Sequence, residues 1–73
     1  MKVKIKETMK RVFHMDSVPD DISQSNYAKW DSLQHLNLVV ELEEEFGASF
    51  EPEEIAEMKS LQEIETILQG RSH

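Results

Sequence analysis

One capped, amphipathic stretch near the middle of the chain constrains the fold more than any other feature. It runs from Ser32 to Phe46 and lies between Asp31 and Gly47. Asp31, with Gln34 three residues later, has the form of a capping box, which predicts that a helix begins at Ser32. Gly47 suits the left-handed conformation that ends many helices, because it has no Cβ atom. The sequence therefore predicts a helix of about four turns at 3.6 residues per turn.

This predicted helix carries two apolar stripes. The first has the spacing of a core-facing stripe and consists of His35, Leu38, Val39, Leu42 and Phe46. The second consists of Leu33, Leu36 and Val40 and is flanked by Asn37, Glu41, Glu43 and Glu44. A single stripe would serve the core, so the second indicates a surface that a partner protein reads by shape and charge. The alternative is that both stripes are buried, because small helical domains pack on broad faces.

Local signals predict three further helices and no strand. Apolar residues from Ile5 onward recur at helical spacing, Pro52 suits a first turn, and Ser60 with Glu63 forms a second capping box. The predicted elements are a helix at 2–14, a long loop at 15–30, a short helix at 52–58, a last helix at 61–69 ended by Gly70, and a tail at 71–73. We expect Val18, Ile22, Tyr27 and Trp30 to pin the long loop to the helices. The predicted fold is all-α: a small four-helix bundle, with three main helices and a short third one, forming a single domain over 1–73.

Composition excludes several classes of function. The formal net charge of the 73-residue chain is −7, which disfavours nucleic acid and favours basic protein partners. The basic first helix is interpreted as a solvated face that offsets this charge. The chain has no cysteine, so any thiol that it uses must come from a prosthetic group. No apolar run approaches the ~20 residues of a membrane span, and we expect a cytoplasmic protein.

The side chains do not support catalysis by the chain itself. His14, His35 and His73 lie far apart in the sequence and lack metal-ligand spacing, so no metal site is predicted. We expect His35 to be a partly buried structural residue. Ser32 has no base at catalytic spacing and is better interpreted as the substrate of another enzyme. It lies at the positive end of the helix dipole, which favours an attached phosphodiester, although by position alone it could be an ordinary first-turn residue.

Two motifs resemble the acyl carrier protein family. They are Asp31-Ser32-Leu33 at the start of the predicted helix and Leu42-Glu43-Glu44-Glu45-Phe46-Gly47 at its end. The resemblance implies that a phosphopantetheinyl transferase attaches 4′-phosphopantetheine from coenzyme A to Ser32, between Asp31 and Leu33. The terminal thiol would hold acyl or aminoacyl groups as thioesters, and an aliphatic cargo could be sheltered between the second and third helices. The implied partners are this transferase, a loading ligase, and acyltransferase or synthase enzymes, which meet a monomeric carrier.

The sequence departs from the family pattern at two positions. Trp30 precedes the motif where a small residue is usual, and Asn37 stands where many members have Glu. Both departures favour a specialised biosynthetic pathway over general fatty acid synthesis. Trp30 is expected either to anchor the loop or to touch the arm and its cargo. The alternative function for the whole chain is an unmodified helical module for protein interaction, in which Ser32 carries nothing.

Overall fold

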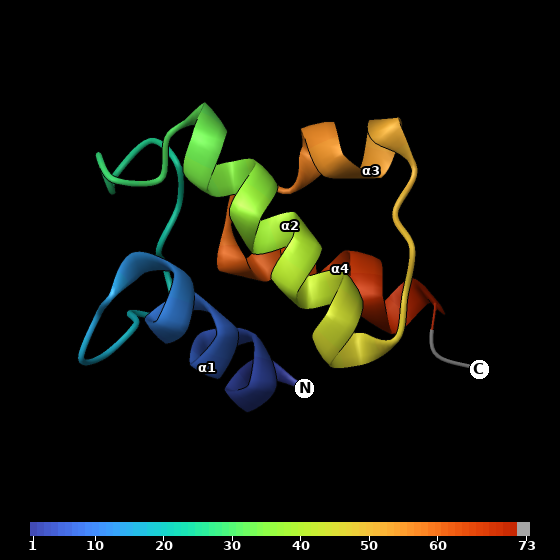
Figure 1. Cartoon of the computed structure of the whole chain (residues 1–73), viewed down its shortest axis with the longest axis horizontal. Helices are drawn as coiled ribbons and strands as arrows, with labels where there is room; N and C mark the ends of the chain where they lie inside the picture. Colours follow the sequence, from blue (N-terminus) through green and yellow to red (C-terminus); the bar gives the residue numbers. More distant parts are fainter. Residues whose placement is uncertain (72–73) are drawn as a thin grey trace.

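The four predicted helices are present in the computed structural model, which describes residues 1–71. The helices are α1 (Lys2–Phe13), α2 (Ser32–Phe46), α3 (Pro52–Glu57) and α4 (Leu61–Arg71). Figure 1 shows α1 packed beside α2, while α4 lies behind α2 in that view. Within residues 1–71 there is no strand, and the only β-type pairing is an isolated bridge between Ser23 and Ser60. The all-α bundle with a long loop between α1 and α2 is therefore confirmed.

Helix α2 begins and ends where its sequence predicts. The Asp31 carboxylate accepts a hydrogen bond from the Gln34 backbone N–H at 2.9 Å. Gly47 takes the left-handed conformation with φ of 60° and donates its N–H to the Glu43 carbonyl oxygen. Leu38, Val39 and Leu42 of the core-facing stripe are buried, as the periodicity indicates. Both ends are set by residues within one turn of them, which is why the sequence alone locates them.

Three other helix ends differ from the prediction. Helix α1 ends at Phe13 because His14 takes a left-handed conformation, with φ of 56°, and its N–H bonds the Lys10 carbonyl. Helix α4 continues through Gly70 to Arg71, so the prediction that Gly70 ends it is wrong. Gly70 does not adopt positive φ, and glycine ends a helix only where it takes that conformation. Helix α3 ends at Glu57, one residue early, and Ser72 and His73 of the predicted tail lie outside the described residues.

The long loop contributes to the hydrophobic core. Val18, Ile22 and Trp30 are buried and Tyr27 packs partly buried against them, which confirms the predicted anchors. The loop is also tied to the start of α4, where Leu61 N–H donates to the Ile22 carbonyl at 3.1 Å. The remaining core residues come from α1, α2 and α4 and from the segments on either side of α3: Ile5, Met9, Phe13, Leu38, Val39, Leu42, Phe50, Met58, Leu61, Ile64 and Leu68.

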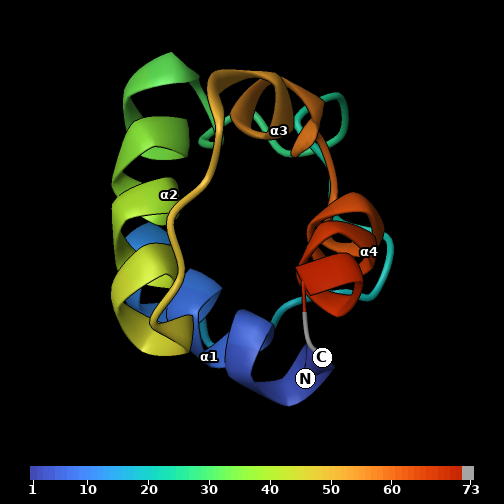
Figure 2. The same cartoon turned by 90° about the vertical axis from the view of Figure 1, so that its right-hand side faces the viewer.

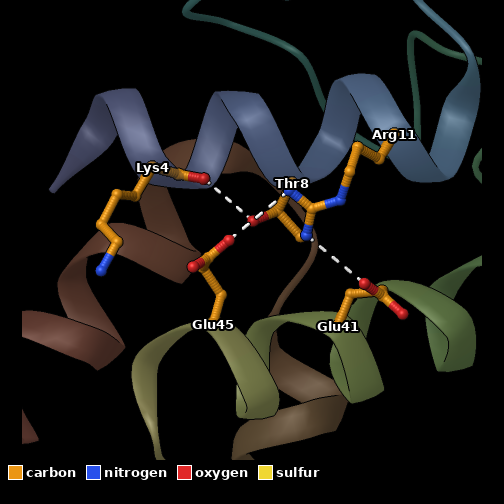
Figure 3. A network of polar contacts seen from close by, with 5 residues as sticks. All are labelled: Lys4, Thr8, Arg11, Glu41 and Glu45. Carbon is orange, nitrogen blue, oxygen red and sulfur yellow. Dashed lines mark hydrogen bonds and ion pairs between the residues drawn. The ribbon is translucent and has the colours of Figure 1, made fainter.

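Three basic side chains of α1, Lys2, Lys6 and Arg11, are paired with acids of the loop or of α2. Lys6 donates a hydrogen bond to the Asp20 carboxylate, and with Lys2 nearby it holds the pKa of that carboxyl below its ordinary value. Arg11 reaches Glu41 at 3.4 Å and Glu45 at 3.5 Å across the α1–α2 interface (Figure 3). These pairs are exposed to solvent, which weakens them, so they orient α1 rather than stabilise it strongly.

Figure 2 shows α3 lying across the end of the bundle at which α2 begins. Met58, which follows α3, has no exposed surface and holds this end against the core. The start of α2 and the whole of α3 are therefore neighbours, although about twenty residues separate them in the sequence. None of the helices within residues 1–71 has the length and apolar character that a membrane span requires.

The two glycines should respond to substitution in opposite directions. A Cβ atom at either position would meet no heavy atom within 4 Å, so conformation alone decides the outcome. We expect Gly47→Ala to lower the free energy of unfolding by about 1 kcal/mol, because alanine is strained at positive φ. We expect Gly70→Ala to raise it by up to about 1 kcal/mol, because alanine has the higher helix propensity. Urea unfolding followed by circular dichroism measures both, and equal effects would contradict the assigned conformations.

Candidate functional site

Ser32 is the first residue of α2 and its side chain is exposed. Asp31 accepts the Gln34 N–H, whereas the N–H groups of Ser32 and Leu33 have no acceptor within the helix by its geometry. The hydroxyl therefore lies beside unpaired backbone donors at the positive end of a 15-residue helix. A phosphodiester on this oxygen would be favoured by that field, so the local chemistry fits a phosphate-linked prosthetic group.

A hydrogen-bonded relay fixes the position of this helix start. The Trp30 indole Nε1–H donates to His35 Nδ1 at 3.0 Å, and His35 Nε2 lies 2.8 Å from the Ile55 carbonyl oxygen. An indole nitrogen only donates and a carbonyl only accepts, so the imidazole must accept at Nδ1 and donate at Nε2. This relay, formed by Trp30, His35 and the Ile55 carbonyl, joins the end of the long loop, the first turn of α2 and the middle of α3.

Trp30 acts as an anchor of the loop. Only 2% of its surface is exposed, and its ring centroid lies 5.6 Å from that of Phe13 on α1. An indole so deeply buried offers no surface to an arm in solvent, so the anchor interpretation is confirmed and contact with the arm is not supported. His35 is half-buried and bonded through both ring nitrogens, which confirms its predicted structural role.

The second apolar stripe of α2 is exposed to solvent. The exposed fractions are 68% for Leu33, 56% for Leu36 and 52% for Val40. The alternative in which both stripes are buried is therefore wrong. Asn37, on the same face, is exposed and donates to the Gln34 side chain at 3.3 Å. That this face binds partner proteins stays a prediction.

The three carboxylates predicted to bind partners differ in their surroundings. Glu41 pairs with Arg11 (Figure 3), and Glu43 Oε2 accepts the Phe50 backbone N–H at 2.9 Å. Glu44 is exposed. Glu43 therefore holds the connection to α3, whereas Glu44 points its charge outward and is the best placed of the three to meet a basic partner.

Sequence reasoning missed a groove between α1 and α2. It has a volume of about 370 Å³ and is lined by Arg11, Val12, Gln34, Asn37, Val40 and Glu41. Val40 and Asn37 belong to the predicted partner-binding face, so the groove extends that face onto α1. Arg11 and Val12 are distant in sequence and showed only the pattern of an amphipathic first helix.

The described residues bring neither a free imidazole of α2 nor a metal-ligand cluster to Ser32. His35 is the imidazole nearest to Ser32 in the sequence, and both of its nitrogens are engaged in the relay. It therefore does not serve as a base for the Ser32 hydroxyl without breaking those bonds. No group of three or more metal-ligating side chains gathers anywhere in residues 1–71. What remains is an exposed hydroxyl at a helix start, beside an apolar and acidic surface.

A comparison with protein families agrees with this arrangement. The family described as "Phosphopantetheine attachment site" matches residues 3–68, which is nearly the whole chain. A comparison with curated proteins finds no match.

Removal of the indole donor should destabilise the fold. We expect Trp30→Phe to lower the free energy of unfolding by about 1–3 kcal/mol, because His35 Nδ1 loses its partner in a partly buried position. Tyr27→Phe is the matched control, since it keeps the ring that packs against Phe13 at 5.4 Å, and it should change stability by less than about 0.5 kcal/mol. Chemical unfolding measures both variants. Equal stabilities of the two would show that the relay contributes nothing.

Proposed function

Because the chain belongs to the phosphopantetheine attachment site family, we propose that Ser32 is the residue that carries the 4′-phosphopantetheine arm. A domain of this family is a carrier, the substrate of modifying and loading enzymes rather than a catalyst. The observation that supports Ser32 is its exposed hydroxyl at the capped start of α2, within the Asp31-Ser32-Leu33 motif. A second observation is that both ring nitrogens of His35 are engaged in the relay, so this imidazole does not act as a base for the serine.

The residues of the chain have separate roles in the attachment. Ser32 Oγ would form the new phosphorus–oxygen bond and lose its proton, while 3′,5′-ADP leaves from coenzyme A. Asp31 holds the helix start in place through the Gln34 N–H, and the unpaired N–H groups of the first turn face the new phosphodiester. Leu33, which is exposed beside the serine, offers apolar contact to the transferase. The bound arm supplies a thiol that the chain itself lacks.

Partner enzymes would dock on the exposed face of α2. Leu33, Leu36 and Val40 supply apolar contact there, and Glu44 supplies an unshielded charge for a lysine or arginine of the partner. Glu41 contributes less, because Arg11 already pairs with it. Asn37 replaces a charge that many carriers have at this position, which favours partners other than those of general fatty acid synthesis. The cargo is then an acyl or aminoacyl thioester of a specialised biosynthetic pathway.

The second candidate function is an unmodified interaction module. The same exposed stripe and groove would serve it without any arm. The two functions differ in whether partner binding depends on the arm at Ser32. An unmodified module binds its partners through the helix face alone. Its binding would be equal for the wild type and for Ser32→Ala, whereas the partners of a carrier distinguish the two.

The attachment site is tested by intact mass. We expect incubation with coenzyme A and a broad-specificity transferase to add the mass of one phosphopantetheine to the wild type. Ser32→Ala should gain nothing, because it lacks the accepting oxygen. Ser17→Ala, in an exposed part of the long loop, should be modified like the wild type. Modification of Ser32→Ala, or none of the wild type, would overturn the assignment.

The docking face is tested by the rate of this modification. We expect Leu36→Ala to reduce kcat/KM at least about fivefold, since truncation of a central interface side chain costs more than about 1 kcal/mol. Its stability should change by less than about 0.5 kcal/mol, because Leu36 is largely exposed. Val3→Ala is the control, an equally apolar residue that is 72% exposed on α1. A similar loss of rate in both variants would argue against a specific face.

A further inference from the structure

We propose that the cargo on the Ser32 arm stays outside the helical core, so that this domain serves short or polar acyl groups rather than long alkyl chains. This inference rests on the proposed function of Ser32. It contradicts the shelter between the second and third helices that the family resemblance implies. The relay of Trp30, His35 and the Ile55 carbonyl carries the argument.

The relay lies between the attachment point and the core. Ser32 and His35 are three residues apart on α2 and therefore neighbours on one helix face. His35 Nε2 then spans to the Ile55 carbonyl of α3 at 2.8 Å. A chain that folded back from Ser32 to enter between α2 and α3 would start beside the contact that joins these two helices. Figure 2 shows that α3 lies at this end of the bundle and not at the other.

A hydrocarbon chain cannot form hydrogen bonds with the polar groups that it would separate. Opening the contact leaves the His35 Nε2–H unpaired, although the Ile55 carbonyl keeps the Met58 N–H, and movement of the ring also frees the indole N–H of Trp30. The Trp30 side chain is almost fully buried, so water does not replace its partner. Buried polar groups without partners are strongly unfavourable, and methylene groups neither donate nor accept.

The core residues behind the relay are fully buried. Leu38 and Leu42 of α2 and Met58, Leu61 and Ile64 from the second half of the chain have no exposed surface. An alkyl chain that entered the core would have to displace these side chains, and overpacking of a protein interior is generally unfavourable. Short or polar acyl groups gain little from burial and do not need that space. Both observations therefore favour the same class of cargo.

Acyl chains of graded length test the proposal. A broad-specificity transferase would load the wild type from acetyl-, octanoyl- and dodecanoyl-coenzyme A, with intact mass to confirm each product. We expect the three thermal midpoints to agree within about 2 °C, because none of the chains enters the core. The methyl NMR signals of Met58 and Ile64 should likewise keep the same positions in all three forms.

A second part of the experiment tests whether His35 is the residue that keeps the acyl chain out of the core. His35→Ala removes both hydrogen bonds of the relay, and its thermal midpoint should rise from the acetyl to the dodecanoyl form. Gln34→Ala is the control on the same turn and should behave like the wild type. If the thermal midpoint of His35→Ala does not depend on chain length, His35 is not the residue that excludes the acyl chain from the core.

Two results on the wild type would overturn the proposal. A midpoint that rises with chain length, or methyl signals of Met58 and Ile64 that move with it, would show that the chain enters the core and would leave the carrier function intact. The absence of any mass gain at Ser32 would instead overturn the proposed function and this inference with it.

Discussion

The position of the α2 start depends on one buried polar contact, the indole N–H of Trp30 bonded to His35 Nδ1. Its net contribution to stability is modest, about 1 kcal/mol for a typical hydrogen bond. Its effect on geometry is larger, because a shift of the loop would leave a buried donor unpaired at a cost of about 1–3 kcal/mol. The loop, the first turn of α2 and α3 therefore move together or not at all. The Ser32 hydroxyl is presented by a helix end whose neighbours are fixed.

The two stripes of α2 have different physical roles. One is in the core, where Leu38 and Leu42 are fully buried, and the other leaves Leu33 and Leu36 in solvent. Burial of one such leucine would stabilise the fold by about 1.5–3 kcal/mol, which is a large share of the total for a chain of this length. Folding alone therefore does not explain the exposed stripe. A partner protein that covers the exposed stripe during each encounter explains it. The adjoining groove between α1 and α2 enlarges the surface available to that partner.

The distribution of charge narrows what that partner can be. The chain has a net charge of −7, but the basic side chains of α1 neutralise part of the acidic surface nearest to them, including Glu41 and Glu45. The Glu43 carboxylate accepts a hydrogen bond from the Phe50 N–H. The charge left unshielded on α2 is therefore sparser than the acidic run in the sequence suggests. A partner would be steered by the overall negative potential and then recognise the apolar stripe at close range.

The sequence predicted what local residues determine and missed what distant residues decide. Asp31 and Gly47 located both ends of α2, because caps act within one turn, and the 3.6-residue period separated its buried stripe from its exposed one. Gly70 misled because a glycine ends a helix only where the chain must turn, and here it continues. The pairing of Arg11 with Glu41 and the bond from His35 to the Ile55 carbonyl join residues about 20–30 positions apart, for which no local pattern exists. Every residue has a backbone carbonyl, so the residue type at position 55 does not indicate that its carbonyl binds His35. The sequence therefore could not show this contact, which most constrains the site.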